Sequence, residues 1–392
     1  MTVTTPTAGD LRARVADALP VLRGNARWND ENRRLHEDTL GVLLDTGVVR
    51  MRVPARYGGH ESDANTLVRV VGEVARGDGA AAWNTAVWAM GAWLAGLFPD
   101  HVQDEVFGDP DVRVCGVLSP TATARPDGGD LVVDGRWAFI SGALHSQWQV
   151  VLAMAPTPDG AGVWPVLALV PMAQLGIVDD WHTSGLRGTG SVTTVAEGVR
   201  VPPDRVLPMP LVLQEQYASR LNAGSPVWRA PMMATGCASF VGVAASMVRE
   251  AISGFLGRLD HKITYTAYES SREAPITHHK LAEAVYLADE AEFHAQRLAD
   301  LLDRKGLEGA PWDLAERVAA RAALGRVFRL AGTAVDVLAT ASGGSSLYAT
   351  EPIQRIRRDV QALNLHALMH PDTNAELYGR VLCGVEPNTA YL

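Results

Sequence analysis

Apolar residues recur at helical spacing through the first hundred residues of the chain. The spacing of three or four positions between Leu11, Val15, Leu19 and Leu22 predicts an amphipathic helix. The pattern returns at 35–44 and 65–75, and an Ala- and Trp-rich segment at 80–98 continues it. Between them, residues 53–59 contain one Pro and two Gly and predict a turn. We therefore expect a helical N-terminal domain over residues 1–110.

Short β-branched and apolar runs replace this pattern between residues 111 and 210. Turn residues separate the runs, as they do between the strands of a sheet. Asp134-Gly135 is typical of a type I′ hairpin turn, and Pro202-Pro203 closes the series. Strands are expected at 113–118, 131–133, 137–140, 149–154, 163–170, 191–196 and 198–201. They predict a middle β-domain, a barrel or sandwich, over residues 111–210.

Four long helical segments with few breakers fill most of the remaining chain. They span 232–260, 275–302, 314–341 and 352–369, and four helices of this length most simply form a bundle. We expect this C-terminal four-helix bundle over residues 211–392. The order of helices, strands and helices makes the predicted fold class α+β.

Composition and charge indicate a globular protein. Of the 392 residues, 47% are hydrophobic and 20% are charged, which is enough apolar material for large buried cores. The 35 Lys and Arg against 44 Asp and Glu give a net charge of −9, and no basic patch offers a footprint for nucleic acid. No long uncharged apolar run and no secretion signal are recognisable, and three widely spaced cysteines form no disulfide framework. We therefore expect a cytoplasmic protein without nucleic-acid or membrane partners.

Several common catalytic motifs are absent from the sequence. It contains no Gly-Lys dipeptide and hence no P-loop, no GxSxG elbow, and no HExxH or ExxH metal motif. Residues 77–82 match the dinucleotide fingerprint GxGxxA, but a helix is predicted before them where the fingerprint needs a strand, so the match is attributed to chance. The adjacent His278 and His279 point to different sides of a helix and are expected to be exposed. If the chain is an enzyme, its reactive centre is expected to be a bound organic cofactor, with no metal.

Three regions, in order along the chain, resemble motifs of the acyl-CoA dehydrogenases. In the first of them, Phe139 stands where that family has the Trp of a strand beside its flavin, and Ser141 where it has Thr. The resemblance covers nearly the whole chain and implies the acyl-CoA dehydrogenase-like fold. The regions are Asp134–Gly142, then Gly185–Ser191 with Val201-Pro202, then Ser342–Tyr348 with Gln354–Asp359.

The carboxylate that dehydrogenation requires is missing from both of its known positions. In many dehydrogenases of this family it lies eight residues beyond the Asp of the Arg-Asp pair, which here is Ala367. The second known placement falls within residues 216–249, where neither Asp nor Glu occurs. Without such a base the α-proton of a thioester is not removed, so the sequence disfavours a dehydrogenase.

The chain is more similar to the group D two-component flavin-dependent monooxygenases, the phenol, indole and secosteroid hydroxylases built on the same scaffold. His366 lies seven residues after Asp359, where this family has a His, and Trp83 follows the small residues Ala81 and Ala82. Where many members have a second His, this chain has Gly91. The strand pattern W-x-F-x-S-G-x-x-H-x-x-W is matched by Trp137, Phe139, Ser141, Gly142, His145 and Trp148.

This resemblance implies a reaction and its site residues. Reduced FAD or FMN, supplied by a separate NAD(P)H-dependent reductase, would react with O2 to a C4a-hydroperoxyflavin that hydroxylates a phenol- or indole-type aromatic substrate, including polycyclic natural products. His366 and Ser141 are the expected catalytic residues, with the Ser141 hydroxyl donating to the flavin N5 region and His366 donating to the peroxide or removing a phenolic proton. The expected flavin-binding residues are Trp83, Ser119, Phe139, Ser141, Gly343 and Gly344. The expected substrate pocket contains Trp88, His145 and Met233, with Trp93 as a further aromatic wall.

The resemblance also implies a homotetramer, or at least a dimer, because the Gly343-Gly344 loop of relatives reaches the flavin of a neighbouring subunit. Three alternatives remain open from the sequence. They are an N-oxygenase of an amino sugar, an acyl-CoA dehydrogenase-like enzyme, and a non-catalytic use of the fold. Met and Trp around Trp83 and Met233 favour an aromatic substrate over a sugar.

Overall fold

The computed structural model describes residues 7–392. Met1–Pro6 lie outside the described residues, and they belong to the segment in which no secretion signal was recognised. The described chain begins with helices, as the apolar spacing predicts. The capping box of Thr7 and Asp10 starts the first of them, which continues through Pro20. The helices are α1 (Ala8–Asn32), α2 (Glu37–Thr46), α3 (Ala64–Ala75), α4 (Gly79–Ala95) and α5 (Asp100–Val106).

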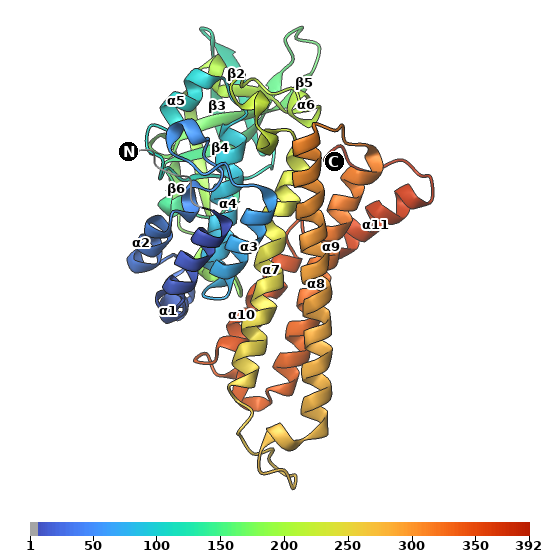
Figure 1. Cartoon of the computed structure of the whole chain (residues 1–392). Helices are drawn as coiled ribbons and strands as arrows, with labels where there is room; N and C mark the ends of the chain where they lie inside the picture. Colours follow the sequence, from blue (N-terminus) through green and yellow to red (C-terminus); the bar gives the residue numbers. More distant parts are fainter. Residues whose placement is uncertain (1–6) are drawn as a thin grey trace.

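The middle of the chain forms one hydrogen-bonded sheet of eight strands, with the order β6-β7-β3-β2-β4-β5-β8 and β1 paired in parallel with β4. The strands gather at one end of the molecule, and the long C-terminal helices extend away from them (Figure 1). The strands are β1 (Val114–Gly116), β2 (Ala122–Asp127), β3 (Asp130–Ile140), β4 (Trp148–Pro156), β5 (Val163–Pro171), β6 (Gly176–Val178), β7 (Val192–Val201) and β8 (Val206–Pro208).

The hairpin predicted at Asp134-Gly135 is wrong. The turn instead lies at Gly128-Gly129, between β2 and β3, and both glycines have positive φ angles. Gly135 lies inside β3 opposite Ala122, where a Cβ would come within 2.3 Å of the Ala122 Cβ. Glycine at position 135 therefore allows β2 and β3 to approach each other closely. An Asp-Gly pair can thus lie inside a strand as well as in a turn.

The C-terminal region contains three long helices and three shorter ones. The C-terminal boundary predicted for the fourth helix, 352–369, is wrong. Helix α10 ends at Asn364, and a new helix begins at Pro371. Proline has no amide hydrogen and restricts the residue before it, which explains the second boundary. The helices are α6 (Met209–Leu213), α7 (Met232–Leu256), α8 (Pro275–Glu308), α9 (Leu314–Ala341), α10 (Pro352–Asn364) and α11 (Pro371–Leu382).

Helix α4 lies at the centre of the molecule, between the sheet and the bundle (Figure 1), and every residue of it is buried. At Gly91 the helix is so close to β1 that a Cβ would lie 1.9 Å from the Val114 carbonyl oxygen. Position 91 therefore faces β1 and has no room for the second His of the family pattern. The glycines of the GxGxxA match also serve packing, since Cβ atoms at Gly77 and Gly79 would collide with Leu22 and Met247.

Helix α7 is long and apolar enough to cross a membrane by length and composition alone, but 89% of its most apolar window is buried inside the protein. It packs against α3, α4, α8 and α9, which is the position of a core helix. Close approach to α3 requires Gly242, where a Cβ would lie 2.4 Å from the Val68 carbonyl oxygen. The predicted exposure of His278 and His279 on α8 is confirmed.

Candidate active site

Ser141 lies at the centre of a chain of short hydrogen bonds that joins α4 to β3 and β7. The Trp83 indole Nε1–H donates to the Ser141 Oγ at 2.8 Å. The Ser141 Oγ lies 2.7 Å from the Ser191 Oγ, which lies 2.6 Å from the Thr189 Oγ1. Thr189 in turn donates to the Leu186 carbonyl oxygen at 2.7 Å. All three hydroxyl residues are buried, so their geometry is fixed by protein rather than by solvent.

The end of β3 places Ser141 at this point. Phe139 has a φ of 65° and Gly142 a φ of 72°, so the strand leaves extended geometry on both sides of Ser141. Two features require glycine at position 142. Its φ is positive, and a Cβ there would lie 2.5 Å from the Trp88 Nε1. The Gly142 N–H donates to the Thr189 carbonyl oxygen at 3.1 Å, which also accepts from the Asn84 side chain at 3.2 Å.

His366 lies beside Trp83, in the turn that follows α10 rather than on the predicted helix. The two rings meet edge to face with centroids 5.4 Å apart, and Phe240 of α7 packs on Trp83 at 4.7 Å. The His366 Nδ1 accepts from the Leu368 N–H at 3.2 Å. Because an amide N–H can only donate, the proton of the neutral imidazole is on Nε2. His366 keeps solvent-exposed surface, and desolvation by the surrounding protein lowers the pKa of its ring, so the imidazole is neutral at pH 7.

Asp359 connects α10 to the same chain of hydrogen bonds. Its Oδ1 accepts from the Leu186 N–H at 2.6 Å, and burial raises its pKa to about 7. The carboxylates of Asp30 and Asp78 raise this pKa further, while the Arg355 guanidinium opposes them. A short buried contact thus fixes the Gly185–Ser191 turn to the helix that leads to His366.

Phe139, two residues before Ser141, presents an exposed aromatic surface. Its side chain is 65% exposed, although it is large and apolar, and it meets Trp181 edge to face with centroids 5.8 Å apart. A large apolar group left open beside a buried hydroxyl is suited to covering by a planar ligand.

Trp88 and His145 lie behind Ser141 and contact different groups. The Trp88 Nε1 donates to Ser146 Oγ at 3.0 Å, and the Arg113 guanidinium lies over the Trp88 ring at 6.0 Å from its centroid. Burial, with a contribution from Arg113 and Arg34, lowers the pKa of His145 to about 4. The His145 Nε2 is buried and has no hydrogen-bond partner among residues 7–392.

The other predicted site residues do not join this group through any hydrogen bond among residues 7–392. Ser119 lies in the loop after β1, and Gly343 and Gly344 form an exposed loop after α9. Met233 is buried on α7 in a second core cluster. Trp93 is in the same cluster, fully buried, with its Nε1 donating to the Val227 carbonyl oxygen, and its role as a wall of the site stays a prediction.

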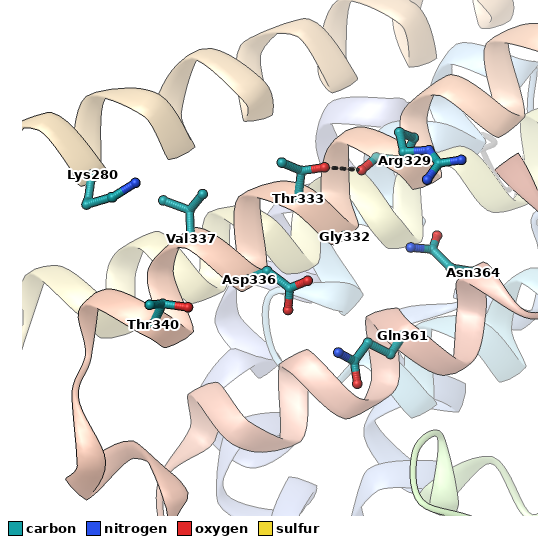
Figure 2. Close-up of a pocket in the computed structure, with 9 residues that line it drawn as sticks. All are labelled: Lys280, Arg329, Gly332, Thr333, Asp336, Val337, Thr340, Gln361 and Asn364. Carbon is teal, nitrogen blue, oxygen red and sulfur yellow. Dashed lines mark hydrogen bonds between the residues drawn. The ribbon is translucent and has the colours of Figure 1, made fainter.

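Two surface grooves lie apart from the predicted site residues. One, of about 410 Å³, lies among α8, α9 and α10, where Lys280, Asp336 and Asn364 face it (Figure 2). The other, of about 600 Å³, is lined by Tyr217, Arg229 and the Gly309–Pro311 turn, among others. Neither groove is lined by a residue of the predicted site.

Comparison with known proteins decides the family. The model of the acyl-CoA dehydrogenase C-terminal domain matches residues 234–371. The oxygenase subunit HsaA of a flavin-dependent monooxygenase from Rhodococcus jostii is 30% identical, over 92% of this chain and 95% of its own. The chain belongs to the flavin-dependent monooxygenases of the acyl-CoA dehydrogenase fold.

Further relatives of this monooxygenase agree in sequence and in structure. The oxygenase component of FADH2-dependent resorcinol hydroxylase from a Rhizobium species is 28% identical over 97% of this chain and 96% of its own. The structure of XiaF from a Streptomyces species in complex with FADH2 and glycerol superposes with a TM-score of 0.92, at 27% identity and 97% coverage of both chains. The predicted α+β, acyl-CoA dehydrogenase-like fold and the predicted monooxygenase family are thereby confirmed, and an oxygenase component of a two-component system implies a separate flavin reductase.

The residues around Ser141 fit a flavin. A buried hydroxyl next to an exposed aromatic ring provides a polar contact and a stacking surface, and the His366 Nε2 has no hydrogen-bond partner among the described residues. The position of the dehydrogenase base, Ala367, lies in the same turn as His366 and carries no ionisable group. The monooxygenase thus retains polar groups near this surface while lacking the base of α-proton removal.

Sequence reasoning missed Ser191, Thr189 and Phe240 as members of this group. Thr189 stands at the Ser/Thr position of the motif G-x-R-x-(S/T) that the segment Gly185–Ser191 resembles, but the resemblance gives it no role. Nothing in a single sequence distinguishes the Ser191 hydroxyl from those of other turns. Phe240 is one of many apolar residues on α7, and only the crossing of α7 with α4 brings it to Trp83.

Proposed function

We propose that this monooxygenase hydroxylates an electron-rich aromatic ring of the phenol or indole type, including polycyclic natural products. Reduced FAD or FMN, delivered by an NAD(P)H-dependent reductase in the cytoplasm, would supply the two electrons for the reduction of O2, from which one oxygen atom enters the ring and the other leaves as water. The names of two relatives support this class, because one acts on resorcinol and another is an indole-3-acetate monooxygenase. Aromatic groups at the candidate site, Trp83, Phe139 and Phe240, support it as well.

The observation that carries the proposal is the state of His366. Because the His366 Nδ1 accepts from the Leu368 N–H, the neutral imidazole carries its proton on Nε2 and is a hydrogen-bond donor there. Desolvation lowers the pKa of the ring, which weakens it as a base. His366 therefore holds a phenolic or oxygen acceptor by donation from Nε2. Of the two roles expected from the sequence, donation is favoured over removal of a phenolic proton.

The remaining roles follow from position. Trp83, Ser141 and Phe139 form the flavin side, with Phe139 as the stacking surface. Packing around the flavin excludes water, which matters because water promotes loss of reducing equivalents as peroxide. Ser119 on the flavin side, and Trp88, His145 and Met233 on the substrate side, keep the roles that the resemblance implies.

Assembly into a homotetramer or dimer completes the proposal. Gly343 and Gly344 are exposed, and a Cβ at either would meet nothing within 4 Å, so this loop is free to approach a neighbouring subunit. On α8, Tyr286 and Phe293 lie seven residues apart and are 73% and 62% exposed. Large aromatic residues on one helix face are typical of a subunit contact.

The experiment mixes the protein and anaerobically reduced FAD or FMN with ¹⁸O2 and a panel of phenols and indoles. The proposal predicts a hydroxylated product containing one ¹⁸O atom, with flavin oxidised in equal amount. Peroxide alone across the whole panel, with no labelled product, would refute the substrate class while leaving the family assignment intact.

A further inference from the structure

The hydrogen bonds around Ser141 have only one consistent direction. Four short contacts link the Trp83 indole, Ser141, Ser191, Thr189 and the Leu186 carbonyl oxygen. Three hydroxyls and one indole N–H supply one proton for each contact. Since a carbonyl oxygen cannot donate, Thr189 donates to Leu186, Ser191 donates to Thr189, and Ser141 donates to Ser191.

In this direction Ser141 uses its single hydroxyl proton in the hydrogen bond to Ser191. Its oxygen accepts from the Trp83 N–H and keeps one lone pair unused, so toward any further ligand it is an acceptor. The Ser141 hydroxyl can donate elsewhere only if its 2.7 Å hydrogen bond to Ser191 is given up or if every hydrogen bond of the series changes direction. Donation from Ser141 to the flavin, expected from the sequence, is therefore opposed by its neighbours.

The far end of the chain is rigid. Leu186 has a φ of 52°, a left-handed value that a leucine adopts only where its surroundings impose it. Its N–H donates to Asp359 at 2.6 Å, and its carbonyl oxygen also accepts from the Trp181 Nε1 at 2.9 Å. The Thr189 carbonyl oxygen is fixed by donors from Asn84 and Gly142. The acceptor that sets the direction is thus held from several elements.

The two redox states of flavin differ at the atom that matters here. Reduced flavin has a hydrogen on N5 and donates, whereas oxidised flavin has a bare N5 that only accepts. We propose that Thr189 and Ser191 are positioning residues that hold Ser141 as an acceptor for the N5–H, so that the site selects reduced over oxidised flavin. This inference rests on the proposed function, in which Ser141 faces N5.

The test compares dissociation constants of oxidised and reduced flavin, the latter measured anaerobically, and needs no turnover. Wild-type protein is expected to have a ratio of oxidised to reduced constants well above one. Thr189→Val keeps the shape of the side chain but removes its hydroxyl, so Ser191 turns to Ser141 and frees the Ser141 proton for N5. The ratio should fall about tenfold, the effect of one hydrogen bond that changes direction.

Three variants make this result specific. Thr189→Ser restores the hydroxyl and should restore the wild-type ratio. Thr85→Val is the matched control, because the buried Thr85 Oγ1 also donates to a carbonyl oxygen, that of Ala81 at 2.9 Å, but is outside the chain, and it should leave the ratio unchanged. Ser191→Ala removes the partner of the Ser141 proton by a smaller change and should lower the ratio as well, even if Thr189→Val fails to fold.

A spectroscopic measurement on the protein without flavin tests the chain directly. The ¹H–¹⁵N signal of the Trp83 indole, assigned with Trp83→Phe, should shift in Thr189→Val and Ser191→Ala but not in Thr85→Val. An unchanged ratio in both Thr189→Val and Ser191→Ala, with flavin still bound, would overturn the inference. Failure of wild-type protein to bind either redox state would instead refute the proposed function.

Discussion

Trp83 and His366 meet edge to face with ring centroids 5.4 Å apart, and this contact joins the central helix α4 to the turn after α10. The indole serves two partners at once, because its ring borders His366 and its Nε1–H reaches Ser141. The two residues expected to act in catalysis are therefore linked through one rigid side chain. Their relative position depends on α4, which is buried along its whole length.

Replacing His366 should separate flavin binding from hydroxylation. In His366→Ala, the Nε2 donor is lost while Trp83, Ser141 and Phe139 remain, so reduced flavin should still bind within about twofold. Product formation should fall about 100-fold to 1,000-fold, the usual range for loss of one positioned donor. Product and peroxide are measured together, and peroxide should account for the missing product.

The exposed His279 on α8 supplies the control for that variant. His279→Ala should leave both product and peroxide unchanged. If His366→Ala retained full product yield, His366 would have no part in the reaction.

Adding one methyl group at Gly142 should disturb the site through Trp88. The Cβ of Gly142→Ala would lie 2.5 Å from the Trp88 Nε1, on a backbone with φ of 72°. Strain at such a position costs on the order of 1–3 kcal/mol, measured by urea unfolding. Gly129→Ala, with φ of 97° but open space around its Cβ, shows the contribution of φ alone. Equal losses in the two variants would mean that the contact with Trp88 is not a constraint.

Stability should depend on pH through Asp359. Its folded-state pKa is raised from 3.8 to about 7, first by burial, so the folded protein binds a proton that the unfolded chain releases. This contribution to stability is complete below about pH 4 and is lost as pH rises through 7. Asp359→Asn stays neutral and keeps an oxygen acceptor for Leu186, so its advantage over wild type should grow to on the order of 2 kcal/mol at pH 8.

Unfolding free energies at pH 5 and pH 8 measure this effect, with the exposed Asp17→Asn as control. The nearby Arg355 reduces the effect, since its guanidinium favours the charged carboxylate. If Asp359→Asn and wild type differed in unfolding free energy by the same amount at pH 5 and pH 8, the raised pKa of Asp359 would be contradicted.

Substrate size should depend on Gly236, on the side of α7 near His366. A Cβ there would meet only Leu368 and Met90, each at 3.9 Å, so a larger side chain finds space between them. Gly236→Leu should raise KM for larger aromatic substrates at least tenfold while leaving the dissociation constant of reduced flavin unchanged. Gly254→Leu, on the exposed face of the same helix, should change neither. Unchanged KM across substrates of different size would place the substrate away from Gly236.

The sequence predicted the order of elements well, because helical and strand spacing are local properties. It failed where a tertiary contact determines the role of a residue. Gly135 resembles a turn residue but lies in a strand because Ala122 leaves no room for a Cβ, and α10 ends before His366, so the predicted helical position of that residue is a turn.

Candidate site residues divide in the same way. Ser141 and His366 were predicted because motif resemblance marks them, and the structure brings both to Trp83, while their catalytic roles stay predictions. The role of Trp93 stays a prediction, because aromatic composition alone does not distinguish a site wall from a core residue and the side chain is fully buried. Thr189 and Ser191 needed the fold, since their effect depends on a carbonyl oxygen that only the Leu186 turn presents.

The most direct test of the account is the reoxidation of protein-bound reduced flavin, followed by stopped-flow absorbance after mixing with oxygenated buffer. The account predicts that the bound flavin reoxidises with a rate and spectra distinct from those of free reduced flavin, and that a phenol or indole substrate changes this course. Reoxidation at the rate and with the spectra of free flavin, whatever aromatic compound is added, would contradict the central claim that this site controls the reaction of reduced flavin with O2.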